Sequence, residues 1–127
     1  MPRVLLIETD RQLAKNLQSY LELNDFIVDI HSDIQNAIMS TDTQCPDVII
    51  LDLILAGRSG IEFLYELRSY PEWQSVPVIA TGHISQDELS HYGSAFEQLN
   101  VSAYLPKHSA FDRLAGEIRK LLQPAKV

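Results

Sequence analysis

Residues 47–55 read Asp-Val-Ile-Ile-Leu-Asp-Leu-Ile-Leu, so one carboxylate, Asp52, stands inside a run that is otherwise aliphatic. Burying a charged side chain is costly unless the charge is paired or hydrogen-bonded. The cost is avoided if the aliphatic residues form a buried β-strand that ends here, because a carboxylate at the strand end can leave the core. The stretch therefore predicts a buried strand with a polar site at its carboxyl end.

Similar aliphatic runs recur along the chain, separated by segments with helical spacing. The predicted strands are residues 4–7, a strand beginning at 26–28, and residues 48–51, 77–80 and 101–105. Apolar residues at intervals of three and four predict a helix after each strand. For four of the helices these positions are Leu13, Leu17, Tyr20 and Leu21; Ile34, Ala37 and Ile38; Ile61, Leu64, Tyr65 and Leu67; and Phe111, Leu114, Ile118, Leu121 and Leu122. The remaining helix, between the fourth and fifth strands, is predicted over residues 86–99.

The alternation of five strands with five helices predicts an α/β fold. Such an order is typical of a parallel sheet with helices on both faces. Strands that are aliphatic throughout, without polar alternation, fit a sheet that is covered on both sides. Ligand sites in these sheets lie at the carboxyl ends of the strands, which is where Asp52 is expected.

The composition argues against several classes of function. The chain has 127 residues, which is typical of one domain, and its formal net charge is −7. No cluster of Lys and Arg is present, so nucleic acid is not expected as a direct partner. No apolar run is long enough to span a bilayer, and the first residues lack a signal-peptide pattern, so no membrane association is expected. Cys45 is the single cysteine, which excludes an internal disulfide and favours a cytoplasmic location.

Polar residues stand at the predicted carboxyl ends of four strands. The first strand leads into Glu8-Thr9-Asp10, the third into Asp52, the fourth into Thr81 and the fifth into Lys107. Because these ends meet at one edge of a parallel sheet, the side chains are expected to converge. Clustered carboxylates suit Mg²⁺, which takes oxygen ligands and keeps several waters. The lysine can neutralise an anion, and the hydroxyl can donate a hydrogen bond to one.

The motifs at these strand ends resemble those of response-regulator receiver domains, over essentially the whole chain. Pro-Asp-Val-Ile-Ile-Leu-Asp-Leu at 46–53 and Ser-Gly-Ile-Glu-Phe-Leu at 59–64 resemble the family's phospho-acceptor segment. Tyr-Leu-Pro-Lys at 104–107 resembles its fifth-strand signature, and Thr-Gly-His at 81–83 a common end of its fourth strand. The resemblance implies a flavodoxin-like (βα)5 fold with strand order 2-1-3-4-5. We expect residues 1–123 to form the receiver domain and 124–127 a short tail, with no output domain in this chain.

The resemblance also implies a role for each strand-end residue. Asp52 would accept a phosphoryl group from a sensor histidine kinase or a histidine phosphotransfer protein, with Thr81 and Lys107 contacting that group. Mg²⁺ would be held by Glu8, Asp52 and the backbone carbonyl of Ile54. No enzymatic activity is expected beyond this self-catalysed gain and loss of phosphate.

The implied output is a change in partner binding. Thr81 would move toward the phosphoryl group and Tyr104 would swing inward behind it, which couples the site to the face of the fourth helix, fifth strand and fifth helix. A downstream protein target would read that face, and two copies of the chain are expected to be able to pair through it.

The chain departs from the family pattern at the first strand end. The family has two adjacent acids there, but the second position is Thr9, and a neutral hydroxyl is a poorer Mg²⁺ ligand than a carboxylate. The expectation is therefore a weakened affinity for Mg²⁺. Thr9 with Gln12 also has the spacing of a helix capping box, and Asp10 alternatively suits the N-cap position. His108 stands where the family usually has proline, which leaves the placement of Lys107 open.

Less specific interpretations stand beside these roles. Thr81 is also suited to capping the following helix, and Tyr104 to a half-buried strand position without a switching role. The four histidines, His31, His83, His91 and His108, share no metal-ligand spacing and are expected at the surface. Cys45, before Pro46, is expected to be a buried inert thiol.

Two other functions compete with phospho-acceptance. A degenerate receiver would act as a phosphorylation-independent interaction module, which Thr9 and His108 favour. A small enzyme or flavin carrier on the same fold is the other alternative. The first strand–helix turn argues against it, because residues 8–14 carry acids and no glycine where a phosphate cradle needs bare amides.

Overall fold

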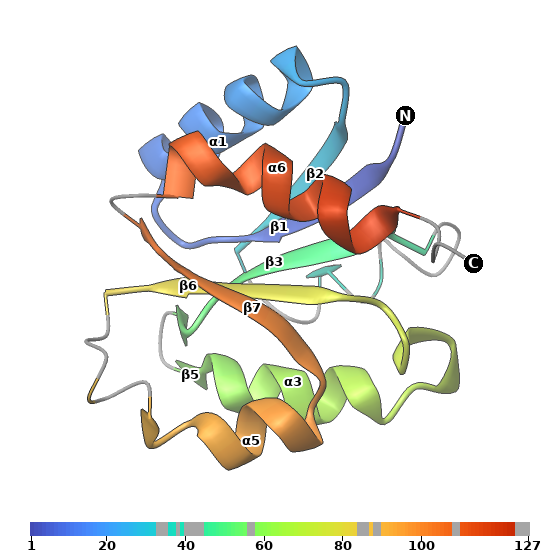
Figure 1. Cartoon of the computed structure of the whole chain (residues 1–127), viewed down its shortest axis with the longest axis vertical. Coiled ribbons are helices and arrows are strands. Elements are labelled where there is room, and N and C mark those ends of the chain that lie inside the picture. The colour runs from blue at the N-terminus through green and yellow to red at the C-terminus, as the bar shows by residue number, and fades with distance from the viewer. Residues whose placement is uncertain are drawn as a thin grey trace.

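A five-stranded parallel sheet forms the centre of the molecule in the computed structural model (Figure 1). The structure describes residues 1–32, 36, 37, 39, 45–55, 58–83, 87, 90–107 and 110–123. The strands are β1 (Arg3–Ile7), β2 (Ile27–His31), β3 (Val48–Asp52), β6 (Val78–Gly82) and β7 (Val101–Pro106). They lie in the order β2-β1-β3-β6-β7, and every neighbouring pair is parallel. Counted along the chain this is 2-1-3-4-5, so the predicted flavodoxin-like topology is confirmed.

Helices cover both faces of the sheet. Helices α1 (Arg11–Leu23) and α6 (Ala110–Leu122) lie on one face, and α3 (Gly60–Arg68) and α5 (Gly93–Gln98) lie on the other (Figure 1). Successive strand residues point to opposite faces, so in β1 Val4 and Leu6 pack beneath α1 and α6. Leu5 and Ile7 pack on the α3 side. Because both faces of the central strands are covered, β3 is aliphatic without alternation up to Asp52, whereas the edge strand β2 carries Asp29 and His31.

Apolar stripes hold the helices against the sheet. In α1 the buried residues are Ala14, Leu17 and Leu21, at helical spacing. The chain leaves α1 through Asp25, whose φ of 71° is a left-handed conformation that ends the helix. In α3 the buried positions include Phe63, Leu64 and Leu67. Tyr65, predicted on this stripe, is instead 55% exposed, because it lies one position beyond Leu64 and turns away from the sheet.

Several short secondary-structure elements were not predicted from the sequence. An antiparallel pair, β4 (Ile54–Leu55) and β5 (Arg58–Ser59), lies between β3 and α3, and the 3-10 helix η1 (Pro71–Trp73) precedes β6. Such elements are too short to show a periodic pattern. The predicted helix over 86–99 is confirmed only in part, because helical geometry at residues 87 and 90 is followed by a turn at 91 and 92, and α5 begins at Gly93. Among the described helices, none is both long enough and apolar enough to cross a bilayer.

Some predicted positions lie outside the described residues. These are Ile34 and Ile38 of the second helix, His108, and the tail at 124–127. Ala37, from the same predicted helix, is described and is fully buried in the core on the α3 side.

Gly60 fixes the approach of α3 to the end of β3. Its amide donates a 2.8 Å hydrogen bond to the carbonyl of Leu53. A Cβ at this position would lie 2.8 Å from the Leu53 Cα and 2.9 Å from the Asp52 carbonyl oxygen. Both contacts are with backbone atoms, which cannot move aside as a flexible side chain would.

We expect Gly60→Ala to lower the free energy of unfolding by about 1–3 kcal/mol, the usual cost of overpacking. The matched control is Gly116→Ala in α6, where a Cβ meets nothing within 4 Å. Removing a helical glycine there should raise stability by about 0.5–1 kcal/mol. Urea denaturation measures both variants, and the same sign for the two substitutions would contradict the steric argument.

Candidate functional site

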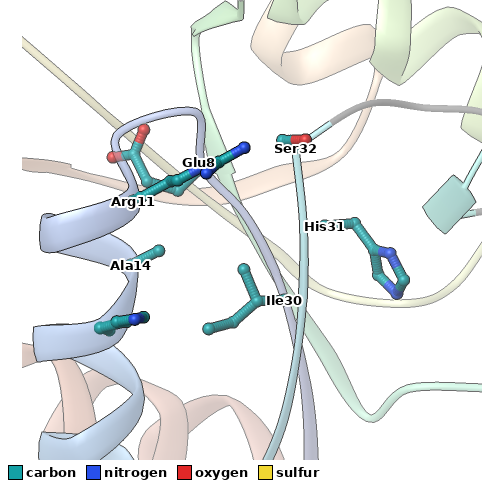
Figure 2. A pocket seen from close by; sticks show the side chains of 7 residues that line it. Glu8, Arg11, Ala14, Ile30, His31 and Ser32 are labelled. Atoms are coloured by element: carbon teal, nitrogen blue, oxygen red, sulfur yellow. The ribbon is translucent and has the colours of Figure 1, made fainter.

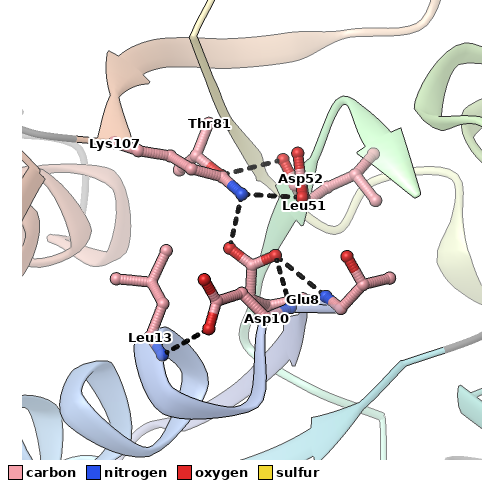
Figure 3. A network of polar contacts seen from close by, with 8 residues as sticks. Glu8, Asp10, Leu13, Leu51, Asp52, Thr81 and Lys107 are labelled. Atoms are coloured by element: carbon pink, nitrogen blue, oxygen red, sulfur yellow. Dashed lines mark hydrogen bonds and ion pairs between the residues drawn. The ribbon is translucent and has the colours of Figure 1, made fainter. Parts of the chain in front are cut away.

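The carboxyl ends of four strands bring the predicted site residues together (Figure 3). Glu8 follows β1, Asp52 ends β3, Thr81 lies in β6 and Lys107 follows β7. Asp52 is the register partner of Thr81 across β3 and β6. Within the described part of the chain, the buried polar residues are Glu8, Asp52 and Thr81, which are 3%, 3% and 5% exposed. The buried polar side chains of the described residues are therefore concentrated at this edge of the sheet.

Lys107 joins the two carboxylates. Its Nζ lies 2.8 Å from Glu8 Oε1 and 2.8 Å from Asp52 Oδ2. The Lys107 side chain is 12% exposed, so the ion pairs are largely shielded from water. Asp52 is thus buried and paired at the end of its strand, instead of leaving the core as the sequence predicted. One ammonium satisfies two acids whose charges would otherwise repel.

Burial and charge shift the pKa values of these groups. Burial, followed by the nearby Asp52, raises the pKa of Glu8, and this outweighs the lowering by Lys107. Burial by itself lowers the pKa of Lys107, but hydrogen bonds to Asp52 and Glu8 outweigh that effect and the net pKa is raised. The lysine is therefore held in its charged form.

The polar side chains of the loop after β1 accept hydrogen bonds from backbone amides of the same loop and of the start of α1. Glu8 Oε2 accepts hydrogen bonds from the amides of Thr9 at 2.8 Å and Asp10 at 3.3 Å. Asp10 is the N-cap of α1, and its Oδ1 accepts a 3.0 Å bond from the Leu13 amide. Gln12 instead bonds Asn16, at 3.1 Å. The Asp10 cap is therefore confirmed and the Thr9–Gln12 capping box is wrong.

The residues at this edge offer oxygen ligands, which are the type that a hard divalent cation binds. Glu8 and Asp52 offer carboxylate oxygens, and the backbone of Ile54 follows within the same turn of chain. Among the described residues, no group of three His, Cys, Asp or Glu side chains could hold a metal. Mg²⁺ takes oxygen ligands and keeps several waters, and the two carboxylates are donors of that kind. The part of Ile54 stays a prediction.

Thr81 lies beside the ion pairs (Figure 3), and Tyr104 lies beside the neighbouring Gly82. Thr81 Oγ1 donates a long 3.4 Å hydrogen bond to the Leu51 carbonyl. Tyr104 is half-buried in β7, and a Cβ at Gly82 would lie 3.5 Å from its hydroxyl. The aromatic ring therefore packs next to Gly82, one residue from Thr81. Sequence reasoning missed this contact and that of Gly60 with β3, although both glycines stand inside the quoted motifs.

Other singled-out residues lie away from the edge. Cys45, predicted to be buried, is exposed, because it precedes β3 outside both core layers. Desolvation, followed by the charges of Asp47 and Glu72, raises the pKa of its thiol. Trp73 is buried in η1, which leads into the amino end of β6, whereas the site lies at the carboxyl end. Its fluorescence is thus not a direct probe of the site.

Comparison with known proteins adds a family match. A model described as the response regulator receiver domain matches residues 4–119. The KDP operon transcriptional regulatory protein KdpE of Escherichia coli (strain K12) is 34% identical over 125 residues, covering 97% of this chain and 52% of that protein. Response regulator MprA of Mycobacterium leprae is 27% identical over 124 residues, covering 98% and 52%. The chain spans about half the length of these relatives.

Solved structures share the fold. The receiver domain of Francisella response regulator 1452 has a TM-score of 0.80 at 25% identity, covering 95% of this chain and 96% of that one. Vibrio cholerae chemotaxis protein CheY4 has a TM-score of 0.85 at 18% identity, covering 96% and 99%. The Mn(2+)-bound form of response regulator Rcp1 has a TM-score of 0.76 at 23% identity, covering 100% and 99%.

The raised pKa of Glu8 predicts a pH-dependent effect of Glu8→Gln. A carboxyl group whose pKa is raised on folding binds more protons in the folded state, so its contribution to stability falls as the pH rises. The free energy of unfolding of the wild type, minus that of Glu8→Gln, should therefore fall as the pH rises from 4.5 through the raised pKa. Urea denaturation in metal-free buffer measures it. A difference that rises with pH would mean that attraction to Lys107 dominates.

Proposed function

The chain belongs to the response regulator receiver domain family, and on that premise we propose that it accepts a phosphoryl group on Asp52 in a two-component phosphorelay. The observation that carries the proposal is the buried contact of Asp52 with Lys107, at 2.8 Å, on the edge where Glu8 and Thr81 converge. Phosphoryl transfer to a carboxylate needs an oxygen nucleophile with dense positive charge beside it. The edge offers Asp52 as the nucleophile and Lys107 as one positive charge beside it, and a bound divalent cation would add the rest.

In the proposed reaction an Asp52 carboxylate oxygen attacks the phosphorus of a phosphohistidine. The new P–O bond forms as the P–N bond breaks, and the electron pair of the broken bond stays on the imidazole of the donor protein. Lys107 then balances charge on the transferred phosphoryl oxygens. Mg²⁺, when bound by Glu8, Asp52 and the carbonyl of Ile54, would supply further positive charge for the same oxygens.

The proposed signal begins with the charge that arrives on Asp52. An aspartyl phosphate has new strong acceptor oxygens and carries a charge of roughly −1.5 to −2 in place of the single charge of the carboxylate, by analogy with other phosphorylated side chains. Thr81 can exchange its long 3.4 Å bond to the Leu51 carbonyl for a shorter one to a phosphoryl oxygen. Tyr104, which packs beside Gly82, would respond to that movement and change the face of α5, β7 and α6.

The proposed partners follow from this role. A sensor histidine kinase or a histidine phosphotransfer protein would donate the phosphoryl group, and a downstream protein would bind the altered face. Pairing of two chains through that face, a cytoplasmic location, and a receiver domain over residues 1–123 belong to the same proposal.

A degenerate receiver is the second candidate, and one observation favours it. Asp10, the nearest acid to the missing family position, is committed to capping α1 through the Leu13 amide. Thr9 is therefore not replaced by a neighbouring carboxylate among the described residues. In our proposal this weakens Mg²⁺ binding without removing the acceptor.

The acceptor role predicts a Mg²⁺-dependent gain of one phosphoryl group on incubation with acetyl phosphate or phosphoramidate. Intact-mass spectrometry measures the gain, and Asp52→Asn should abolish it because no nucleophilic carboxylate remains. The control is Asp25→Asn, an exposed position at φ 71° that asparagine also tolerates. No adduct on the wild type under any condition would move the assignment to the degenerate interaction module.

The Thr9 departure predicts that Thr9→Asp binds Mg²⁺ about tenfold more tightly or better, since each added carboxylate strengthens a hard-cation site. Thr9→Asn, of equal size but neutral, is the matched control and should bind Mg²⁺ like the wild type. Isothermal titration calorimetry measures all three. Equal affinities for the aspartate and asparagine variants would show that position 9 does not face the metal.

A further inference from the structure

A pocket of about 310 Å³ lies between α1 and the end of β2 and shares Glu8 with the edge that holds Asp52 (Figure 2). Arg11, Ala14 and Lys15 of α1 form one side, and Ile30, His31 and Ser32 form the other. Its volume is at the lower end of the range for small-molecule sites, roughly 300–1,000 Å³. We propose that this pocket binds a small phosphorylated molecule, a phosphate monoester with a compact organic body.

The charge on the α1 side is the first argument. Arg11 and Lys15 stand four residues apart, so they share one helix face and repel each other. Neither forms an ion pair with an acid among the residues described. Among the other described cations, Arg3 pairs with Asp29 and Lys107 with Glu8, whereas Arg68 and Arg119 bond backbone carbonyls. Two uncompensated cations beside a cavity, in a chain of net charge −7, favour an anionic ligand.

The arrangement of the walls is the second argument. Figure 2 shows the Arg11 side chain reaching from α1 across the pocket toward Ser32, with Ala14 and Ile30 facing each other below it. The His31 ring points away from α1, although the residue lines the pocket together with Ile30 and Ser32. A guanidinium can hold a phosphate through two parallel hydrogen bonds. The aliphatic walls then receive the uncharged part of the molecule.

Glu8 lines the pocket, but both of its carboxylate oxygens are bonded to other groups of the protein, so we do not expect it to repel a bound anion. Its Oε1 is 2.8 Å from Lys107, and its Oε2 accepts the amides of Thr9 and Asp10. The carboxylate is therefore engaged on the phosphorylation side of the loop. The proposed site does not depend on phosphate transfer to Asp52, but it shares this loop with the acceptor edge.

The test is a titration of the wild-type chain with adenosine 5′-monophosphate, monitored by two-dimensional amide NMR in Mg²⁺-free buffer. We expect the signals of residues 11–15 and 30–32 to shift. Adenosine, which lacks the phosphate, should leave them unchanged. Lys15→Gln and Arg11→Gln should each weaken binding about tenfold, the effect of one charge-assisted hydrogen bond. Lys120→Gln, on an exposed lysine of α6, is the matched control and should bind like the wild type.

Three outcomes would overturn the proposal. The first is no shift at residues 11–15 and 30–32 with either adenosine 5′-monophosphate or inorganic phosphate at millimolar concentration. The second is a shift confined to residues 52, 81 and 107, which would place the anion at the acceptor edge. The third is equal binding by adenosine, or binding of a glutamate-rich peptide where both phosphates fail, which would assign the face to another class of ligand.

Discussion

The contact of the Lys107 ammonium with Glu8 and Asp52 is the interaction on which the carboxyl edge of the sheet depends. The two acids are each 3% exposed and belong to neighbouring strands, so without a cation they would repel at short range in a poorly solvated place. Lys107 reaches them from the far strand β7, at 2.8 Å to each. One side chain therefore ties the ends of β1, β3 and β7 together and holds the proposed nucleophile in place.

The charge balance of this cluster bears on the missing acid. When ionised, the two carboxylates and the ammonium leave the edge negative, a divalent cation makes it positive, and the exchange of the Asp52 carboxylate for an aspartyl phosphate of about −2 then brings its net charge close to zero. Cation and phosphoryl group thus favour each other. With a second acid at position 9 the cation-loaded edge would be less positive. In our proposal a weaker hold on the cation at Thr9 goes with a stronger attraction of the loaded edge for phosphate, so weak metal binding and acceptor activity are compatible.

The sequence predicted the fold and the edge because both follow from short-range patterns. Aliphatic runs mark the strands, and the first polar residue after each run marks the edge, which is how Glu8 and Asp52 were found. What the sequence left open depends on three-dimensional approach. Thr9 and Asp10 both obey the capping pattern, and only the path of the loop selects Asp10. Exposure of Cys45 and the fit of Gly60 over β3 are likewise set by packing, which no local periodicity encodes.

The start of α1 departs from the usual rules of helix stability, and the departure lies at the proposed second site. Behind the Asp10 cap, its first turn holds no acid and opens with Arg11, although a positive charge at a helix N-terminus is unfavourable by about 0.3–1 kcal/mol. Lys15, one turn later, adds about 0.2–0.5 kcal/mol of repulsion. Burial of Leu17 and Leu21 holds the helix in spite of this. Local conflicts of this kind are expected at functional positions. An anion between these cations would relieve both, so binding would also stabilise the turn whose loop amides orient Glu8.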